Sequence, residues 1–109
     1  MWGIAHAVPT AQVLRGFEPI TSDNRRVVLQ EWLAEALTMW GVAALIIAVT
    51  VVADGTNAAH AIYAVAAALL VALAMLTALT GARTPVVWFR ICPALLTLSA
   101  LLLVAAILV

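Results

Sequence analysis

The sequence predicts an all-α integral membrane protein with three transmembrane helices and an N-terminal interfacial arm. Residues 58–82 are almost all Ala, Leu, Val, Ile or Met, and no charged side chain lies between Asp54 and Arg83. About 20 apolar residues, at about 1.5 Å each, cross a hydrocarbon core of about 30 Å. Hydrophobic residues make up 67% of the 109-residue chain and charged residues 9%, whereas a soluble domain carries about 25% charged residues. Lipid is therefore the expected solvent for most of the surface.

Residues 1–24 are predicted to form an arm and a loop at the membrane surface. The first 15 residues are too few to span, and Pro9 removes a backbone donor near their middle. An interfacial, loosely helical arm with Trp2 at headgroup level fits this composition. The alternative is a re-entrant segment packed against the other helices. Residues 16–24 contain turn residues, and Ser22 or Asp23 is the expected N-cap of the next helix.

The transmembrane domain is predicted to be residues 25–109, with helices at about 25–53, 58–80 and 86–109. The first helix begins with charged and apolar residues mixed, and its charge-free part runs from Ala36 to Ala53. A tight polar turn around Gly55 follows, and Gly81 is a plausible C-terminal cap of the second helix. Pro93 predicts a kink or a restart in the third helix.

The arginines predict an orientation in a bacterial cytoplasmic (inner) membrane. All five lie before the first span, in its first turn, or around the link between the second and third spans. The positive-inside rule then places the N-terminus and the Arg83–Arg90 link in the cytoplasm, and the Asp54 turn and the C-terminus outside. The alanine- and arginine-rich composition is associated with bacterial genomes of high GC content.

Net charge and cysteine content exclude several classes of function. Five acidic and five basic residues give a formal net charge of zero, so no electrostatic footprint for nucleic acid exists. The single cysteine, Cys92, rules out an internal disulfide and a multi-cysteine metal site. No spacing typical of a metal or cofactor site occurs, and His60 lies about 30 Å of helix away from Glu31 and Glu35. We therefore expect no metal and no cofactor.

Three charged residues near the cytoplasmic edge are the candidate polar contacts. Glu31 and Glu35 are four residues apart, so they share one helix face. They are either solvated, paired with arginines such as Arg25 and Arg26, or used for ions or protons. Counting about 20 residues back from each span's outer end puts Glu35 and Arg90 at a similar depth, so a Glu35–Arg90 pair is a reasonable prediction.

Two further features concern polar and packing contacts. His6, Glu31 and Glu35 could form a metal set only if the arm folds back, and no typical metal-site spacing supports it, whereas Asp54 could contact His60 at the outer face. The second span carries small residues at four-residue spacing, which let helix backbones approach closely in lipid. The predicted packing face, inside the protomer or against another subunit, is Ala64, Ala68 and Ala72.

The most consistent function is non-catalytic. The chain has no evident nucleophile–base set and only short polar segments, which favours a small subunit or assembly partner of a larger membrane complex, or of copies of itself. Membrane lipids and other membrane subunits are the expected partners. One alternative is a homo-oligomeric transporter or channel that uses Glu31, Glu35 and Arg90. A second alternative is a membrane enzyme acting on a lipid or quinone.

Overall fold

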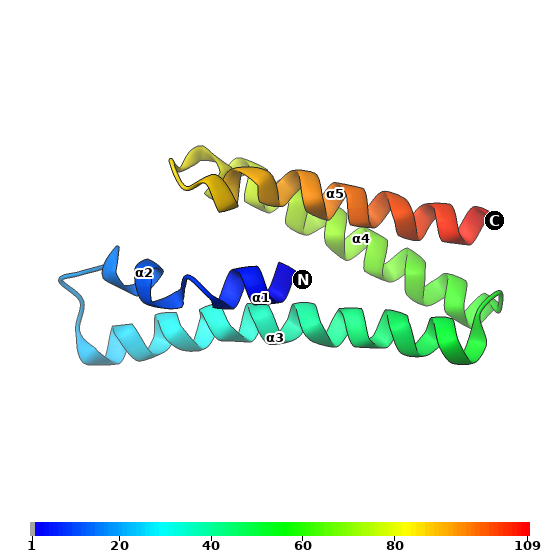
Figure 1. The fold of residues 1–109 in the computed structure, drawn as a ribbon, viewed down its shortest axis with the longest axis horizontal. Helices are drawn as coiled ribbons and strands as arrows, with labels where there is room; N and C mark the ends of the chain where they lie inside the picture. Colours follow the sequence, from blue (N-terminus) through cyan, green and yellow to red (C-terminus); the bar gives the residue numbers. More distant parts are fainter. Residues whose placement is uncertain (1) are drawn as a thin grey trace. The chain divides into compact units, whose positions relative to one another are not determined.

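The computed structural model describes residues 2–109, with the side chain of Trp2 excepted, so the predicted depth of that indole lies outside the described residues. The described chain is helical and contains no strand. The helices, coloured along the chain in Figure 1, are α1 (Trp2–Ala7), α2 (Thr10–Arg15), α3 (Ser22–Ala53), α4 (Asn57–Leu79), η1 (Gly81–Arg83) and α5 (Val87–Leu108). Helices α3, α4 and α5 are each long and apolar enough to cross a membrane. The prediction of an all-α chain with three such helices is confirmed.

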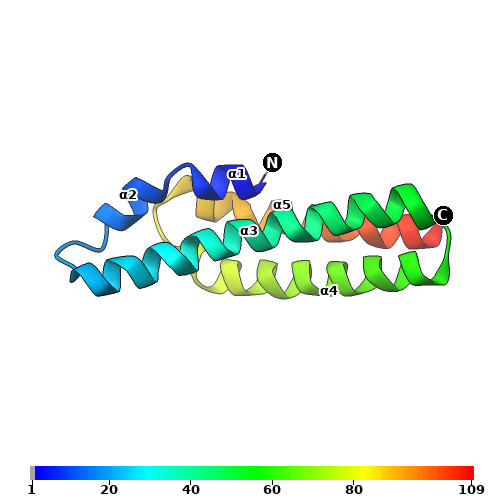
Figure 2. The ribbon, with the colours of Figure 1, turned by 90° about the horizontal axis from the view of Figure 1, so that it is seen from below.

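The chain divides into two compact units, Met1–Ile47 and Ala48–Val109. In the first unit, the arm, expected to be loosely helical, folds as the two short helices α1 and α2. Figures 1 and 2 both show α1 and α2 running antiparallel along the first part of α3, after the reversal at residues 16–21. Helices of six residues are marginal alone, so packing on α3 accounts for their order.

Helix α3 begins earlier than the charge pattern predicts. It starts at Ser22, and the hydroxyl of Thr21 accepts a hydrogen bond from the backbone N–H of Asn24 at 3.2 Å. This is the geometry of an N-cap, because a side-chain oxygen satisfies one of the free donors in the first turn. The expected caps, Ser22 and Asp23, are therefore already inside the helix.

The second unit is an antiparallel helix pair with a tight entry turn. Gly55 has a φ of +73°, a left-handed conformation that glycine adopts without steric cost, as the sequence predicts. Thr56 then caps α4 by accepting from the backbone N–H of Ala59 at 3.2 Å. Helix α5 packs along α4 and returns toward the turn.

The link between α4 and α5 is ordered by local contacts. Helix α4 ends at Leu79 with Thr80 as its C-cap, so Gly81 is not the cap that the sequence predicts. Gly81 instead begins η1 and lies close to Phe89, since a Cβ on Gly81 would sit 3.4 Å from the Phe89 Cβ. The hydroxyl of Thr84 donates to the Gly81 carbonyl at 2.6 Å. Helix α5 then runs through Pro93 without the restart considered from the sequence.

Small side chains dominate the buried surface of this helix pair. On α5 the buried residues follow a four-residue spacing, which places them on one face: Cys92, Leu96 and Ala100. On α4 the buried residues are Ala59, Tyr63, Ala66, Ala67 and Ala74. Because alanine adds little volume, the two backbones can approach closely, which is how helices gain van der Waals contact in lipid.

Candidate functional site

The best-defined polar cluster lies where the arm contacts α3. His6, in the last turn of α1, is only 7% exposed and is the one buried polar or charged residue in the described chain. Its ring stacks on the Trp32 indole, with ring centroids 3.8 Å apart and an interplanar angle of 19°. The Trp32 Nε1–H donates to the His6 carbonyl at 2.9 Å. Trp32 therefore holds both the side chain and the backbone of His6.

Glu35 completes this cluster from the next turn of α3. Its Oε2 lies 3.3 Å from His6 Nε2, which is close enough for an ion pair when the imidazole is protonated. The buried Nε2 makes no hydrogen bond of good geometry, so the contact is one of proximity and charge. Trp32 and Glu35 are three residues apart and share a helix face. The arm folds back far enough for His6 to reach Glu35, but Glu31 takes no part, so the three residues of the metal set considered from the sequence are not brought together.

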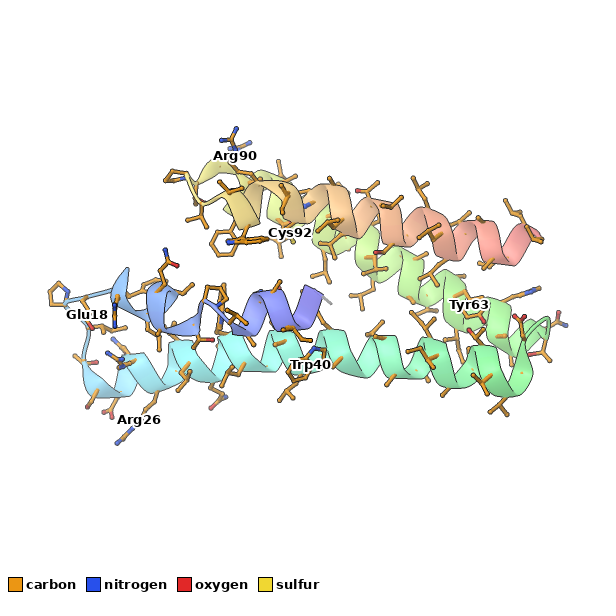
Figure 3. The ribbon with its side chains drawn as sticks, viewed as in Figure 1. Glu18, Arg26, Trp40, Tyr63, Arg90 and Cys92 are labelled. Carbon is orange, nitrogen blue, oxygen red and sulfur yellow. The ribbon has the colours of Figure 1, made fainter. Side chains whose placement is uncertain are left out.

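A second contact fixes the start of the arm. A Cβ placed on Gly3 would lie 2.3 Å from Trp40 Nε1 and 2.5 Å from its Cδ1. Only glycine fits against the indole without a shift of one of them. Trp32, Ala36 and Trp40 follow at four-residue spacing, and Ala36 is fully buried. Figure 3 shows Trp40 on α3 beside the first turn of α1. The arm thus lies over an aromatic–alanine–aromatic stripe.

Arg25 and Arg26, also in this unit, form exposed local ion pairs. Arg25 Nη1 lies 3.1 Å from Glu18 Oε1, and Arg26 Nη1 lies 3.5 Å from Asp23 Oδ1. The arginines therefore pair with these acids and not with Glu31 or Glu35. Exposed pairs of this kind contribute between 0 and about 1 kcal/mol. Glu31 is exposed and has no ion pair within residues 2–109.

Arg90 lies in the first turn of α5, in the second unit, and is exposed. No ion pair involves it within residues 2–109. A Glu35–Arg90 pair would join the two units and stays a prediction. The only acidic residue in its own unit is Asp54, which precedes α4.

A polar network near the start of α4 was missed by sequence reasoning. The hydroxyls of Thr50 and Tyr63 are 2.6 Å apart, and the Tyr63 hydroxyl lies 3.5 Å from Asp54 Oδ1. Tyr63 is 2% exposed, so its hydroxyl needs such a partner. Tyr63, not His60, contacts Asp54. The sequence did hold a signal for this network, because the only tyrosine of the chain lies about two helical turns after the polar Asp54–Asn57 segment.

The predicted packing face of α4 is not the face that is buried in the described chain. Ala64, Ala68 and Ala72 are all exposed. At 3.6 residues per turn they lie on roughly the opposite side of α4 from Tyr63, Ala67 and the other buried residues. Helix α4 therefore carries small residues on two sides. One side is buried within the chain, and the other is exposed.

The arrangement limits what chemistry the described residues bring together. Among residues 2–109, no group of three His, Cys, Asp or Glu side chains is placed to hold a metal ion. Cys92 is buried on α5. The contact of His6 with Glu35 and Trp32 can hold the arm on α3, and the Tyr63 network can hold the α3–α4 turn. Comparison with protein-family models, curated proteins and solved structures found no match.

Proposed function

We propose that this chain is a small polytopic membrane protein that acts as a non-catalytic subunit or assembly partner of a larger membrane complex or of its own copies. The observation that carries the proposal is the second small-residue face of α4, formed by Ala64, Ala68 and Ala72. Helix α5 covers a comparable face of the same helix within the chain. Small residues at helical spacing are the surfaces through which helices associate in lipid.

Substitution of the exposed face tests this function. Ala68→Leu places a bulky side chain at the centre of the face, whereas Ala105→Leu makes the same change at an exposed position of α5. We expect the wild type and Ala105→Leu to retain their partner or self-association in mild detergent, measured by the mass of the purified complex. We expect Ala68→Leu to lose it. Equal association of all three proteins would exclude this face as the docking surface.

The proposal includes residence in a bacterial cytoplasmic membrane, with the N-terminus inside and the C-terminus outside. It rests on the three apolar helices and on the arginine distribution. A Cys92→Ser background leaves no other cysteine, so single cysteines can be introduced at Asn57, an exposed position beside the Gly55 turn, and at Gly16. In intact cells, an impermeant maleimide should label the position at Asn57 and spare the one at Gly16. The reverse labelling pattern would show the opposite orientation.

A homo-oligomeric transporter or channel that uses Glu31, Glu35 and Arg90 is a second proposal. The specific observation in its favour is the contact between His6 and Glu35, because protonatable pairs at a membrane edge occur in proton relays. Glu35→Gln separates the two functions. Loss of proton or solute flux in vesicles, with unchanged association, would favour transport. Unchanged flux would favour the subunit role.

A further inference from the structure

Two arginines lie in or next to the link between α4 and α5, and no acidic side chain of the same unit is near them. Arg83 ends η1 and Arg90 lies in the first turn of α5, and both are exposed. Neither takes part in an ion pair within residues 2–109. Asp54, the only acid of this unit, lies at the other end of α4, about 35 Å of helix away. An anionic partner of the two arginines would therefore have to come from outside this unit.

Apolar and aromatic side chains surround these charges and indicate the kind of surface that meets them. Val87 is 65% exposed, Trp88 55% and Ile91 38%. Val87, Arg90 and Ile91 are spaced i, i+3 and i+4, so the charge and two apolar side chains share one face of α5. Figure 3 shows the Arg90 side chain directed outward from the start of α5. Exposed tryptophan beside arginine is typical of the layer between hydrocarbon and lipid headgroups.

The link is held in a defined shape, so the two charges are presented by ordered backbone. The close approach of Gly81 to Phe89 connects η1 with the start of α5, and the Thr84 hydroxyl closes η1 by donating to the Gly81 carbonyl. No side chain caps α5, because its N-cap residue is Val86. The positive end of the helix dipole at that first turn adds to the positive potential.

We infer that the η1–α5 link binds the headgroups of anionic phospholipids of the bilayer, with Arg83 and Arg90 as the phosphate contacts and Trp88 in the interfacial layer. Guanidinium groups suit phosphate oxygens, which they contact through two parallel hydrogen bonds. The positive-inside orientation would place this link in the leaflet that carries anionic lipid. This inference rests on membrane residence but not on the subunit role.

Lipid binding by the full chain in detergent tests the inference. Dioleoylphosphatidylglycerol and dioleoylphosphatidylcholine are titrated separately, and bound lipid is counted by native mass spectrometry. We expect the wild type to prefer phosphatidylglycerol and Arg83→Gln/Arg90→Gln to lose that affinity about 30-fold, or about fivefold for each arginine. Arg26→Gln is the matched control, since Arg26 is also exposed but has Asp23 beside it. Its effect should stay within about twofold.

Two further measurements keep the result decisive. Arg83→Lys/Arg90→Lys retains the charge and should recover most of the affinity. If the double glutamine variant does not remain monodisperse, a salt titration of the unchanged chain decides, because binding to phosphate must weaken as ionic strength rises. Equal binding of both lipids, full retention by the double variant, or salt-independent binding would each overturn the inference. None of these results bears on the Ala68→Leu association experiment.

Discussion

The stacking of His6 on Trp32 determines how firmly the arm is held to α3, and His6→Ala measures it. Stacked aromatic rings contribute about 0.5–1.5 kcal/mol beyond burial, and burying a ring of this size adds about 1 kcal/mol. The contact with Glu35 adds little, about 0.5 kcal/mol, because the glutamate side chain is 43% exposed. The substitution should therefore weaken arm docking by about 2 kcal/mol, or about 30-fold.

Two companion variants separate stacking from charge. His6→Phe keeps a ring on the Trp32 indole and removes a buried nitrogen that has no good hydrogen bond. Glu35→Gln removes the charge and keeps the side-chain shape. Each should weaken docking by less than about 1 kcal/mol, because neither removes the stack. His6→Ala should therefore be clearly the most disruptive of the three.

Hydrogen–deuterium exchange of the arm is the assay, because short helices unfold once their tertiary contact is lost. Amides of residues 2–15 should exchange about 30-fold faster in His6→Ala than in the wild type, in the same detergent. Gln12→Ala, at an exposed position of α2, should leave the rate unchanged. Unchanged exchange in His6→Ala would refute the reasoning. An equally large effect of His6→Phe would show that the polar contact, not stacking, holds the arm.

Three other variants test the packing elsewhere. Tyr63→Phe removes a hydroxyl that lies 2.6 Å from a threonine hydroxyl, and thermal unfolding in detergent should show a loss of about 1 kcal/mol; unchanged stability would contradict the network. Ala100→Leu overfills a buried position of α5 and should cost about 1–3 kcal/mol by the same assay, whereas Ala105→Leu should cost nothing. Gly3→Ala should speed exchange of the arm despite alanine's better helix propensity, since its methyl group would overlap the Trp40 indole; slower exchange would refute that overlap.

The three long helices could be predicted from the sequence because length and apolarity alone determine them. The uncharged run between Asp54 and Arg83 admits few structures other than a continuous helix of that length. The helix ends were less predictable, since they depend on local hydrogen bonds. Thr21 caps α3 although Ser22 and Asp23 are equally suited by residue type. Gly81 packs against Phe89 instead of capping α4, and no local sequence pattern reveals that contact.

The contacting faces could not be predicted for a different physical reason. Helix α4 is apolar on every side and rich in alanine, so its pattern contains no polar face that would reveal the buried one. The spacing of Ala64, Ala68 and Ala72 is as regular as that of the residues that are buried. The contact between His6 and Glu35 joins residues far apart in the sequence and depends on the fold-back of the arm.

The distribution of hydrogen-bonding groups determines how a partner helix could recognise these helices. Within α4 and α5, the hydroxyls of Thr77, Thr97 and Ser99 donate to carbonyls of their own helix at 2.8–2.9 Å. Such bonds satisfy polar groups in lipid without a partner. The polar contacts between segments lie instead beside the entry turn of α4 and along the arm. Recognition at mid-helix therefore has to depend on shape, and small side chains such as Ala68 supply that shape by admitting a neighbouring backbone.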